Sequence, residues 1–270
     1  MTTADDCEHR LREIYGPDPR DPPPSPGERR IGGDLAADAG VIHVTAVGRT
    51  NDGSLATIAI GPAAPRSATD WFLLNAARAR ADAIVTTGRI LRAEPDAHHG
   101  PDAAGLDAPA LAAWRRRLGK REPPLSVVLT SGAALDFAHP FFRAGGPVLV
   151  VTGAAAGARL ASAAERAGVA VAERENPGLR DTLRLLRDER GAQTIVVEAG
   201  PHTATPLYES PLAVDELMLS IYEEGPLSAE LRAGSFLDEA AIERLFPARS
   251  APRSAREASG LWSYRRYRRR

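Results

Sequence analysis

Gln193-Thr194-Ile195-Val196-Val197-Glu198-Ala199-Gly200-Pro201-His202-Thr203 is the segment that decides the fold. The apolar, β-branched run from Ile195 to Val197 predicts a buried strand, and the carboxylate of Glu198 comes at its end. Thr205-Pro206 predicts a short helix over 207–210, because threonine caps helices and proline suits their first position. Backbone N–H groups and a helix dipole at such a junction can bind a pyrophosphate. The same pattern also fits an ordinary β-turn-α junction.

The composition indicates a globular protein. Of its 270 residues, 43% are apolar and 26% charged, and no apolar run is long enough to span a bilayer. The net charge of −1 gives no general attraction to nucleic acid or to an anionic membrane. The single cysteine, Cys7, excludes an intramolecular disulfide and a multi-cysteine zinc site. The first ten residues are polar and acidic, unlike a signal peptide, so we expect a cytoplasmic protein.

Strands and helices alternate along the chain. We expect a proline-rich N-terminal extension over 1–40 and one domain over 41–270. Strands are predicted over 41–47, 82–88, 125–130, 147–152, 195–197, 214–222 and 261–270, and helices over 6–14, 69–81, 108–118, 157–167 and 176–190. This alternation predicts an α/β fold with a mostly parallel sheet and antiparallel strands at one edge. The carboxyl ends of the parallel strands would then gather Asp52, Thr87, Ser131 and Glu198.

Several other sites can be weighed from the residues. The chain lacks a P-loop motif and a Gly-x-Gly-x-x-Gly fingerprint after its first strand. We interpret His98-His99 as solvent-exposed loop residues rather than metal ligands, since no third spaced histidine accompanies them. The arginine-rich end, 264–270, is interpreted as a charged edge strand, with RNA contact as the alternative. Arg78, taken alone, would lie on the solvated face of its helix.

Four stretches carry a family resemblance: Asn51-Asp-Gly53, Thr69-Asp-Trp71, the run 79–94, and Ile195-Val-Val-Glu-Ala-Gly-Pro201 followed by Val214-Asp-Glu-Leu217. With them the chain resembles, over about 40–270, the reductase domain of bacterial riboflavin biosynthesis, the C-terminal domain of the bifunctional deaminase-reductase. The resemblance implies a dihydrofolate reductase-like fold, a three-layer α/β/α sandwich. It also implies a homodimer that acts as an NADPH-dependent reductase on a ribosylaminopyrimidine phosphate or a related heterocycle.

The resemblance also assigns residues to roles. Asp52 and Glu198 match catalytic positions, and Thr69, Arg78 and Glu198 match substrate-binding positions. The implied cofactor-binding residues are Trp71, Thr87, Gly88, Ile90, Glu94, Ser131, Ala199, Gly200, Pro201, His202 and Thr203. No metal site is implied, and the Pro-Cys-x-x-Cys motif of the zinc deaminase partner is missing from the sequence.

Several positions depart from the family pattern, among them Gly48-Arg-Thr-Asn51, which replaces the expected Ala-x-Ser-Leu before Asp-Gly. Ala199 and Arg89 stand where the family usually has glycine, and Ile90 stands where it has a cofactor-binding threonine. These departures leave two alternatives open. The chain could be a non-catalytic member of the fold that serves as a binding or dimerisation module, or a reductase for a pterin or folate.

Overall fold

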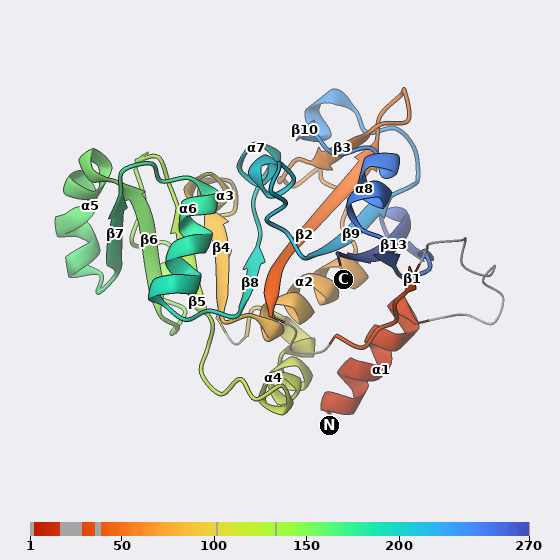
Figure 1. Cartoon of the computed structure of the whole chain (residues 1–270), viewed down its shortest axis with the longest axis horizontal. Coiled ribbons are helices and arrows are strands. Elements are labelled where there is room, and N and C mark those ends of the chain that lie inside the picture. Colours follow the sequence, from red (N-terminus) through yellow and green to blue (C-terminus); the bar gives the residue numbers. More distant parts are fainter. Residues whose placement is uncertain (1–2, 17–28, 36–38, 101, 133, 270) are drawn as a thin grey trace.

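The computed structural model describes residues 3–16, 29–35, 39–100, 102–132 and 134–269. One large sheet runs through the molecule, with helices on both faces (Figure 1). Its neighbouring strands follow the order β1 (Arg29–Arg30), β11 (Ala248–Arg249), β13 (Gly260–Arg268), β9 (Glu216–Tyr222), β2 (Gly40–Arg49), β8 (Thr194–Val197), β4 (Ala83–Thr87), β5 (Leu125–Leu129), β6 (Val148–Gly153) and β7 (Ala170–Arg174). The strands from β9 to β7 are parallel, as predicted, and β13 is antiparallel to β9.

Three further strands lie off this path. β3 (Leu55–Ile58) forms a hairpin with β2, β10 (Arg232–Ser235) pairs with β3, and β12 (Arg253–Glu257) pairs with β13. The expected edge position of the C-terminal strand is therefore wrong, because β11 and β12 both pair with β13 on the side away from β9. Tyr264, Arg266 and Tyr267 are accordingly buried.

The helices are α1 (Ala4–Tyr15), α2 (Ala68–Arg80), α3 (Gly88–Ala93), α4 (Ala108–Arg117), α5 (Ala154–Arg166), α6 (Leu179–Arg184), α7 (Pro201–Ala204) and α8 (Glu239–Leu245). α6 continues as a π-helix over Leu185–Glu189, and α7 continues as a 3-10 turn over Thr205–Leu207. In the described chain no helix has both the length and the apolar character needed to cross a bilayer.

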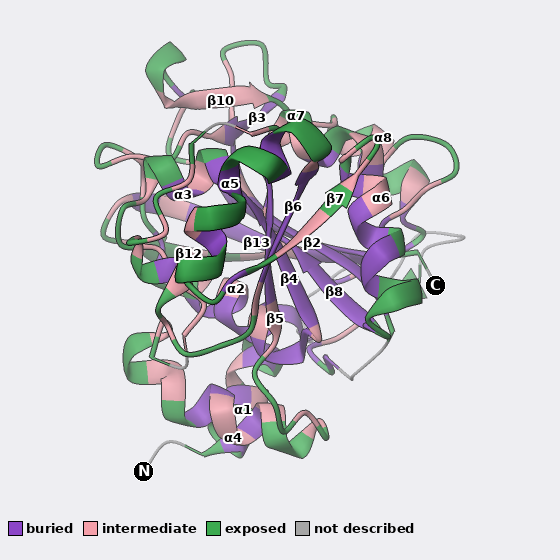
Figure 2. Cartoon of the chain, turned by 90° about the vertical axis from the view of Figure 1, so that its left-hand side faces the viewer, coloured by how far each residue is buried: buried purple, intermediate pink, exposed green. Residues whose placement is uncertain are grey.

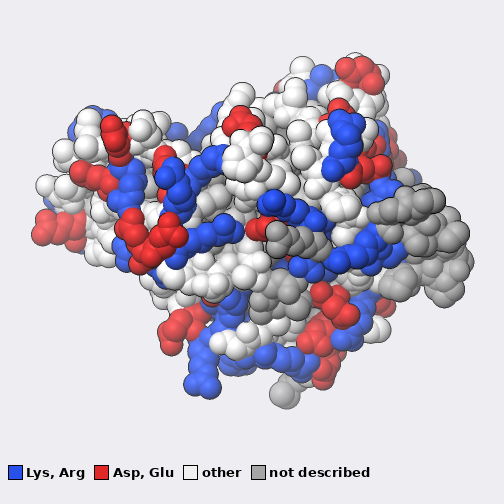
Figure 3. All heavy atoms as spheres, in the orientation of Figure 1, with Lys and Arg blue, Asp and Glu red and all other residues white. Residues whose placement is uncertain are grey.

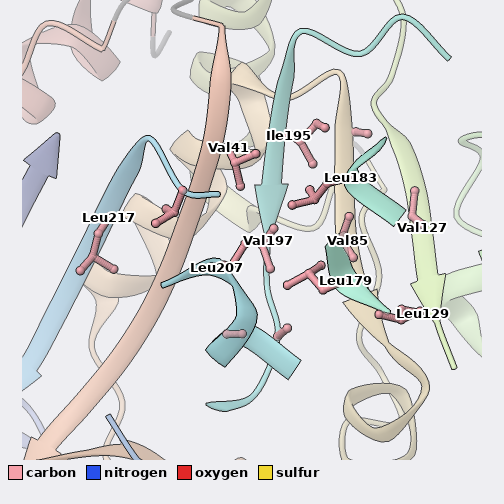
Figure 4. Close-up of a cluster of buried hydrophobic side chains, with 14 of the residues drawn as sticks. Val41, Val85, Val127, Leu129, Leu179, Leu183, Ile195, Val197, Leu207 and Leu217 are labelled. Carbon is pink, nitrogen blue, oxygen red and sulfur yellow. The ribbon is translucent and has the colours of Figure 1, made fainter. Parts of the chain in front are cut away.

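Alternate side chains along β2 and β8 enter two separate cores, because successive residues of a strand point to opposite faces. Val41 and Val197 pack with α6, α7 and α8 on one face, whereas Ile42 and Val196 pack with α1, α2 and α4 on the other. Figure 4 shows the first of these cores, with Leu207 of the 3-10 turn packed against it. The central strands, among them β2, β4 and β8, are the most continuously buried part of the molecule (Figure 2).

The N-terminal helix belongs to the second core. Leu11 and Tyr15 are fully buried there. The proline-rich stretch expected on the surface lies mostly over 17–28, outside the described residues. The boundary at residue 40 stays a prediction.

Helix starts differ from expectation. α1 and α5 begin earlier than predicted and α6 begins later, and the two differences closest to the site are those of α2 and α7. α2 begins earlier, because Ser67 is its N-cap and its hydroxyl accepts a hydrogen bond from the Asp70 amide at 2.8 Å. The helix after β8 begins at Pro201 rather than after Thr205-Pro206. Gly200 and Pro201 supply the extended cap and the first-turn proline directly, so no separate helix start is needed further on.

Charges of both signs are interspersed over the face of the molecule seen in Figure 3, in keeping with the small net charge.

Candidate active site

Arg78 and Glu198 form a buried ion pair between α2 and the end of β8. The Arg78 Nε lies 2.7 Å from Glu198 Oε1, and Nη2 lies 2.7 Å from Oε2. Their side chains are only 14% and 12% exposed. Such bidentate, charge-assisted pairs are among the strongest hydrogen bonds that proteins form. The prediction of a solvated Arg78 is therefore wrong. Arg78 instead lies next to Glu198, as the family resemblance implies by assigning both residues to substrate binding.

His99 is the third member of this cluster, and sequence reasoning missed it. Its Nε2 lies 3.4 Å from Glu198 Oε2, and its Nδ1 lies 3.1 Å from the Ser126 hydroxyl of β5. The side chain is 6% exposed and packs edge-on against Phe141. The expected solvent-exposed loop histidine is thus wrong for His99, and the loop sequence carries no signal that would have placed it here.

Burial and charge set the ionisation of the cluster. Burial opposes a charge on Glu198, but Arg78 and then His99 outweigh it, so the pKa of Glu198 falls well below its usual range. Burial lowers the pKa of His99 in spite of the nearby carboxylate. Burial and the charge of Glu198 raise the pKa of Glu94. At neutral pH the cluster therefore contains an ionised Glu198 and a neutral His99.

α2 also presents a ring and an amide beside the ion pair. The Asn75 side chain accepts a hydrogen bond from Arg78 Nη1 at 3.3 Å and donates to the Trp71 carbonyl at 2.8 Å. Trp71 is 47% exposed, and its ring lies 5.7 Å from the Arg78 guanidinium carbon. Thr69, in the first turn, donates its backbone N–H to Glu257 at 3.2 Å. The helix thus brings the predicted Trp71 and Arg78 next to each other.

A cavity of about 330 Å³ opens beside this cluster. Asn75, Arg78, His99 and Ser126 line it together with Phe141 and residues of α4. Its basic lining residues, besides Arg78, are Arg115, Arg116, Lys120 and Arg121. A cavity walled by arginines and a neutral histidine suits a polar ligand that carries negative charge.

A second cavity, of about 320 Å³, lies at the carboxyl ends of β4 and β5, against the start of α7. It brings together five of the predicted cofactor-binding residues: Thr87, Gly88, Ser131, His202 and Thr203. Arg89 and Arg92 line it as well. At Gly200, which precedes α7, a Cβ atom would meet nothing within 4 Å, so a ligand has room to approach the backbone there.

The remaining predicted site residues lie around these two cavities or apart from them. Ile90, in α3, donates its backbone N–H to the Thr87 hydroxyl at 3.3 Å. Glu94 follows α3, and its carbonyl accepts a hydrogen bond from His139. Ala199 and Pro201 line a third cavity, described below.

Asp52 lies apart from the cluster, on the exposed turn between β2 and β3. Its carboxylate accepts hydrogen bonds from the hydroxyls of Thr50 and Ser54, which lower its pKa to about 2. Among the described residues, it forms no hydrogen bond or ion pair with Arg78, Glu198 or His99. The hydrogen bonds from Thr50 and Ser54 are typical of an aspartate that shapes a turn. The catalytic role assigned to Asp52 stays a prediction.

Solved structures share this fold. A pyrimidine reductase-like protein from Corynebacterium diphtheriae aligns with a TM-score of 0.64 at 20% identity, covering 97% of this chain and 99% of that one. RibD from Acinetobacter baumannii aligns with a TM-score of 0.53 at 17% identity, and 85% of this chain spans 58% of that longer one. No family model and no curated protein matches the sequence. The chain thus has the dihydrofolate reductase-like α/β fold found in these structures.

Proposed function

We propose that this protein is an NADPH-dependent reductase that acts on a ribosylaminopyrimidine phosphate or a related heterocycle. One observation carries the proposal. Glu198, which pairs with Arg78, lies at the end of β8. His202 and Thr203, a few residues further along the chain, line the cavity at the carboxyl ends of β4 and β5. An acceptor site and a dinucleotide site would therefore adjoin at the end of β8, which is where ligands bind in open α/β sheets.

The residues of the second cavity fit a dinucleotide phosphate. The turn over 199–203 leaves space at Gly200, and two residues of this turn, His202 and Thr203, line the second cavity together with the cationic Arg89 and Arg92. When bound there, NADPH would supply the hydride. The chain would bind and orient it through the backbone of the turn, the two arginines and the hydroxyl of Thr203.

The cluster around the Arg78–Glu198 pair, of which Arg78 and His99 line the first cavity, would orient the acceptor. The ionised Glu198 can accept hydrogen bonds from ring amino groups, and Arg78 Nη1 is held by Asn75 only at 3.3 Å, so it can donate to a ligand phosphate. The neutral His99 can donate or accept one hydrogen bond beside them. The exposed ring of Trp71 offers a stacking surface next to this pair.

Titration with NADPH, followed by fluorescence or calorimetry, tests the proposal. We expect saturable binding at sub-millimolar concentration, weakened about tenfold by Arg89→Ala, because one charge-assisted contact is worth about 1.5–3 kcal/mol. Arg121→Ala, which removes a surface arginine from the other cavity, is the matched control and should leave NADPH affinity unchanged. Absence of saturable NADPH binding would contradict the proposal.

A second candidate is a non-catalytic binding module. It is favoured by one observation, that both carboxylate oxygens of Glu198 are already held by Arg78. Saturable NADPH binding without oxidation in the presence of any pyrimidine, pterin or folate acceptor would select this candidate.

A further inference from the structure

A third cavity, of about 280 Å³, lies on the far side of α7 from the proposed dinucleotide site. Pro201, Ala204, Thr205 and Tyr208 line this third cavity, whereas His202, Thr203 and Pro206 line the dinucleotide cavity. Residues spaced i, i+3, i+4 and i+7 share one face of a helix. The short helical segment from Pro201 to Tyr208 therefore forms a wall between two separate cavities.

This cavity also lies across the sheet from the Arg78–Glu198 pair. His43 and Thr45 line it, and they alternate along β2 with Ile42 and Val44, which belong to the core under α2. α2 carries Arg78, so the cavity and the ion pair are on opposite faces of the sheet. Neither the acceptor nor the dinucleotide assigned above accounts for it.

Two buried polar atoms in the cavity wall lack partners. His43 is 1% exposed and Thr57 is 9% exposed. Among the described residues, His43 Nε2 and the Thr57 hydroxyl oxygen have no hydrogen-bond partner. Leaving such groups unsatisfied costs about 1–3 kcal/mol each, so a cavity lined by both favours a ligand that satisfies them.

His43 is held in position by Tyr208. The Tyr208 hydroxyl lies 2.6 Å from His43 Nδ1. Burial raises the pKa of Tyr208 well above its usual value, so the phenol stays protonated and can donate to Nδ1. Burial lowers the pKa of His43 to about 4, with the Ala199 backbone acting in the opposite direction. A neutral imidazole that accepts at Nδ1 carries its proton at Nε2 and can donate it into the cavity.

The rest of the wall selects against anionic ligands. Tyr208 and Phe236 lie 5.8 Å apart, edge to face, and Phe236 lies 6.2 Å from the His43 ring, so flat aromatic surfaces surround the space. No lysine or arginine lines the cavity in the described part of the chain, and Glu209 is its one carboxylate. An anion would find no counter-charge there.

We propose that this cavity binds a small uncharged heterocycle that carries a carboxamide or lactam group. The carbonyl of such a group accepts from His43 Nε2, its N–H donates to the Thr57 hydroxyl, and its ring packs against Tyr208 and Phe236. The ligand is a free heterocycle of this kind, separate from the dinucleotide assigned above.

Nicotinamide is the probe, and nicotinate, which differs from it by a carboxylate, is the matched ligand control. In calorimetric titrations of the full chain at pH 7 we expect saturable binding of nicotinamide and at least tenfold weaker binding of nicotinate. Thr57→Val, which keeps the shape of the side chain, should weaken nicotinamide binding about tenfold. Thr152→Val is the protein control, because Thr152 is also fully buried with an unpartnered hydroxyl but lies outside this cavity.

Tyr208→Phe is a second test that does not depend on Thr57. It removes the hydroxyl that fixes the His43 tautomer, and we expect a several-fold loss of nicotinamide affinity together with a shift of the His43 ring resonances in NMR spectra. Repeating the titration with saturating NADPH tests whether the cavity is separate from the dinucleotide site. We expect undiminished nicotinamide binding, and competition by NADPH would overturn the proposal.

Absence of saturable nicotinamide binding would overturn the proposal, as would equal effects of Thr57→Val and Thr152→Val. The proposed reductase function is tested separately, by the effect of Arg89→Ala on NADPH binding, so either proposal can fail without the other.

Discussion

Two buried arginine–glutamate clusters, each with its arginine on α2, show how similar side chains can have different roles. Arg80 donates from Nη1 and Nη2 to the two oxygens of Glu216, at 2.8 and 3.0 Å, much as Arg78 does to Glu198. The two arginines are two positions apart on the helix and so point to different sides. Arg80 reaches into the sheet at β9, and Arg78 reaches the end of β8.

The surroundings of the two glutamates differ. Glu216 is also held by Arg266, whose Nε and Nη2 lie 3.0 and 3.1 Å from its oxygens, and all three side chains are at most 4% exposed. Arg266 donates further to the Gly32 carbonyl at 2.9 Å. Glu198 has one arginine, a neutral histidine and a cavity beside them. The first cluster joins α2 to β9, β13 and the N-terminal segment, whereas the second leaves donors facing a space that a ligand can enter.

Glu216→Gln should give the largest effect. The substitution removes the carboxylate charge that Arg80 and Arg266 share, and breaking a buried ion pair in this way costs about 3–5 kcal/mol. Glu198→Gln should cost less, about 1–2 kcal/mol, because water can reach Arg78 through the neighbouring cavity. Urea unfolding of both variants measures the two free energies. Equal losses of unfolding free energy in the two variants would contradict the distinction between a structural and a functional cluster.

Arg78→Gln should affect turnover more than stability. If Arg78 orients the acceptor, we expect kcat/KM to fall about 100-fold, which corresponds to about 2.7 kcal/mol of transition-state stabilisation. Arg92→Gln, in the other cavity, should leave the KM for the acceptor unchanged. A loss of stability in Arg78→Gln as large as in Glu216→Gln, with turnover retained, would assign Arg78 to the fold.

Acid should weaken the Glu216 cluster only at low pH. Although burial opposes its charge, Arg80 and Arg266 hold the pKa of Glu216 well below the usual 4.5. Between the folded-state and unfolded-state pKa values of Glu216, the folded state binds fewer protons than the unfolded state. The stability that the Glu216 ion pairs contribute is therefore fully present above about pH 4.5 and is lost as pH falls through the folded-state pKa. The difference in unfolding free energy between wild type and Glu216→Gln should be constant from pH 7 to 5 and shrink below 4.5. A difference that shrinks already at pH 6 would contradict this account.

The smallest effect concerns His99. The charge of Glu198 favours its protonated form, so Glu198→Gln should lower the pKa of His99 further, whereas Glu216→Gln should leave it unchanged. NMR titration of the histidine ring resonances measures both shifts. A pKa of His99 that rises in Glu198→Gln would show that the carboxylate is not its neighbour in solution.

The sequence predicted the framework of this site better than its contacts. Strand β8 and helix α2 follow from an apolar β-branched run and a helical period, which are local signals. The family pattern marked Arg78 and Glu198 separately, but their pairing joins residues 120 positions apart and appears only when the sheet is assembled.

His99 and His43 were out of reach for the same reason. His99 sits in a polar loop, and its burial depends on Ser126 and Phe141, which come from other elements. His43 lies within a strand predicted to be buried, yet its partner Tyr208 is 165 positions away. The start of α7 was misplaced because two Pro-containing signals compete, and Gly200-Pro201 lies closer to the strand.

One measurement tests the central claim most directly, namely the oxidation of NADPH by wild type and Glu198→Gln in the presence of a ribosylaminopyrimidine phosphate. The account predicts acceptor-dependent oxidation by wild type and at least 100-fold slower turnover by Glu198→Gln, with NADPH affinity unchanged within about threefold. Equal turnover by the two proteins, or no acceptor-dependent oxidation by wild type, would contradict it.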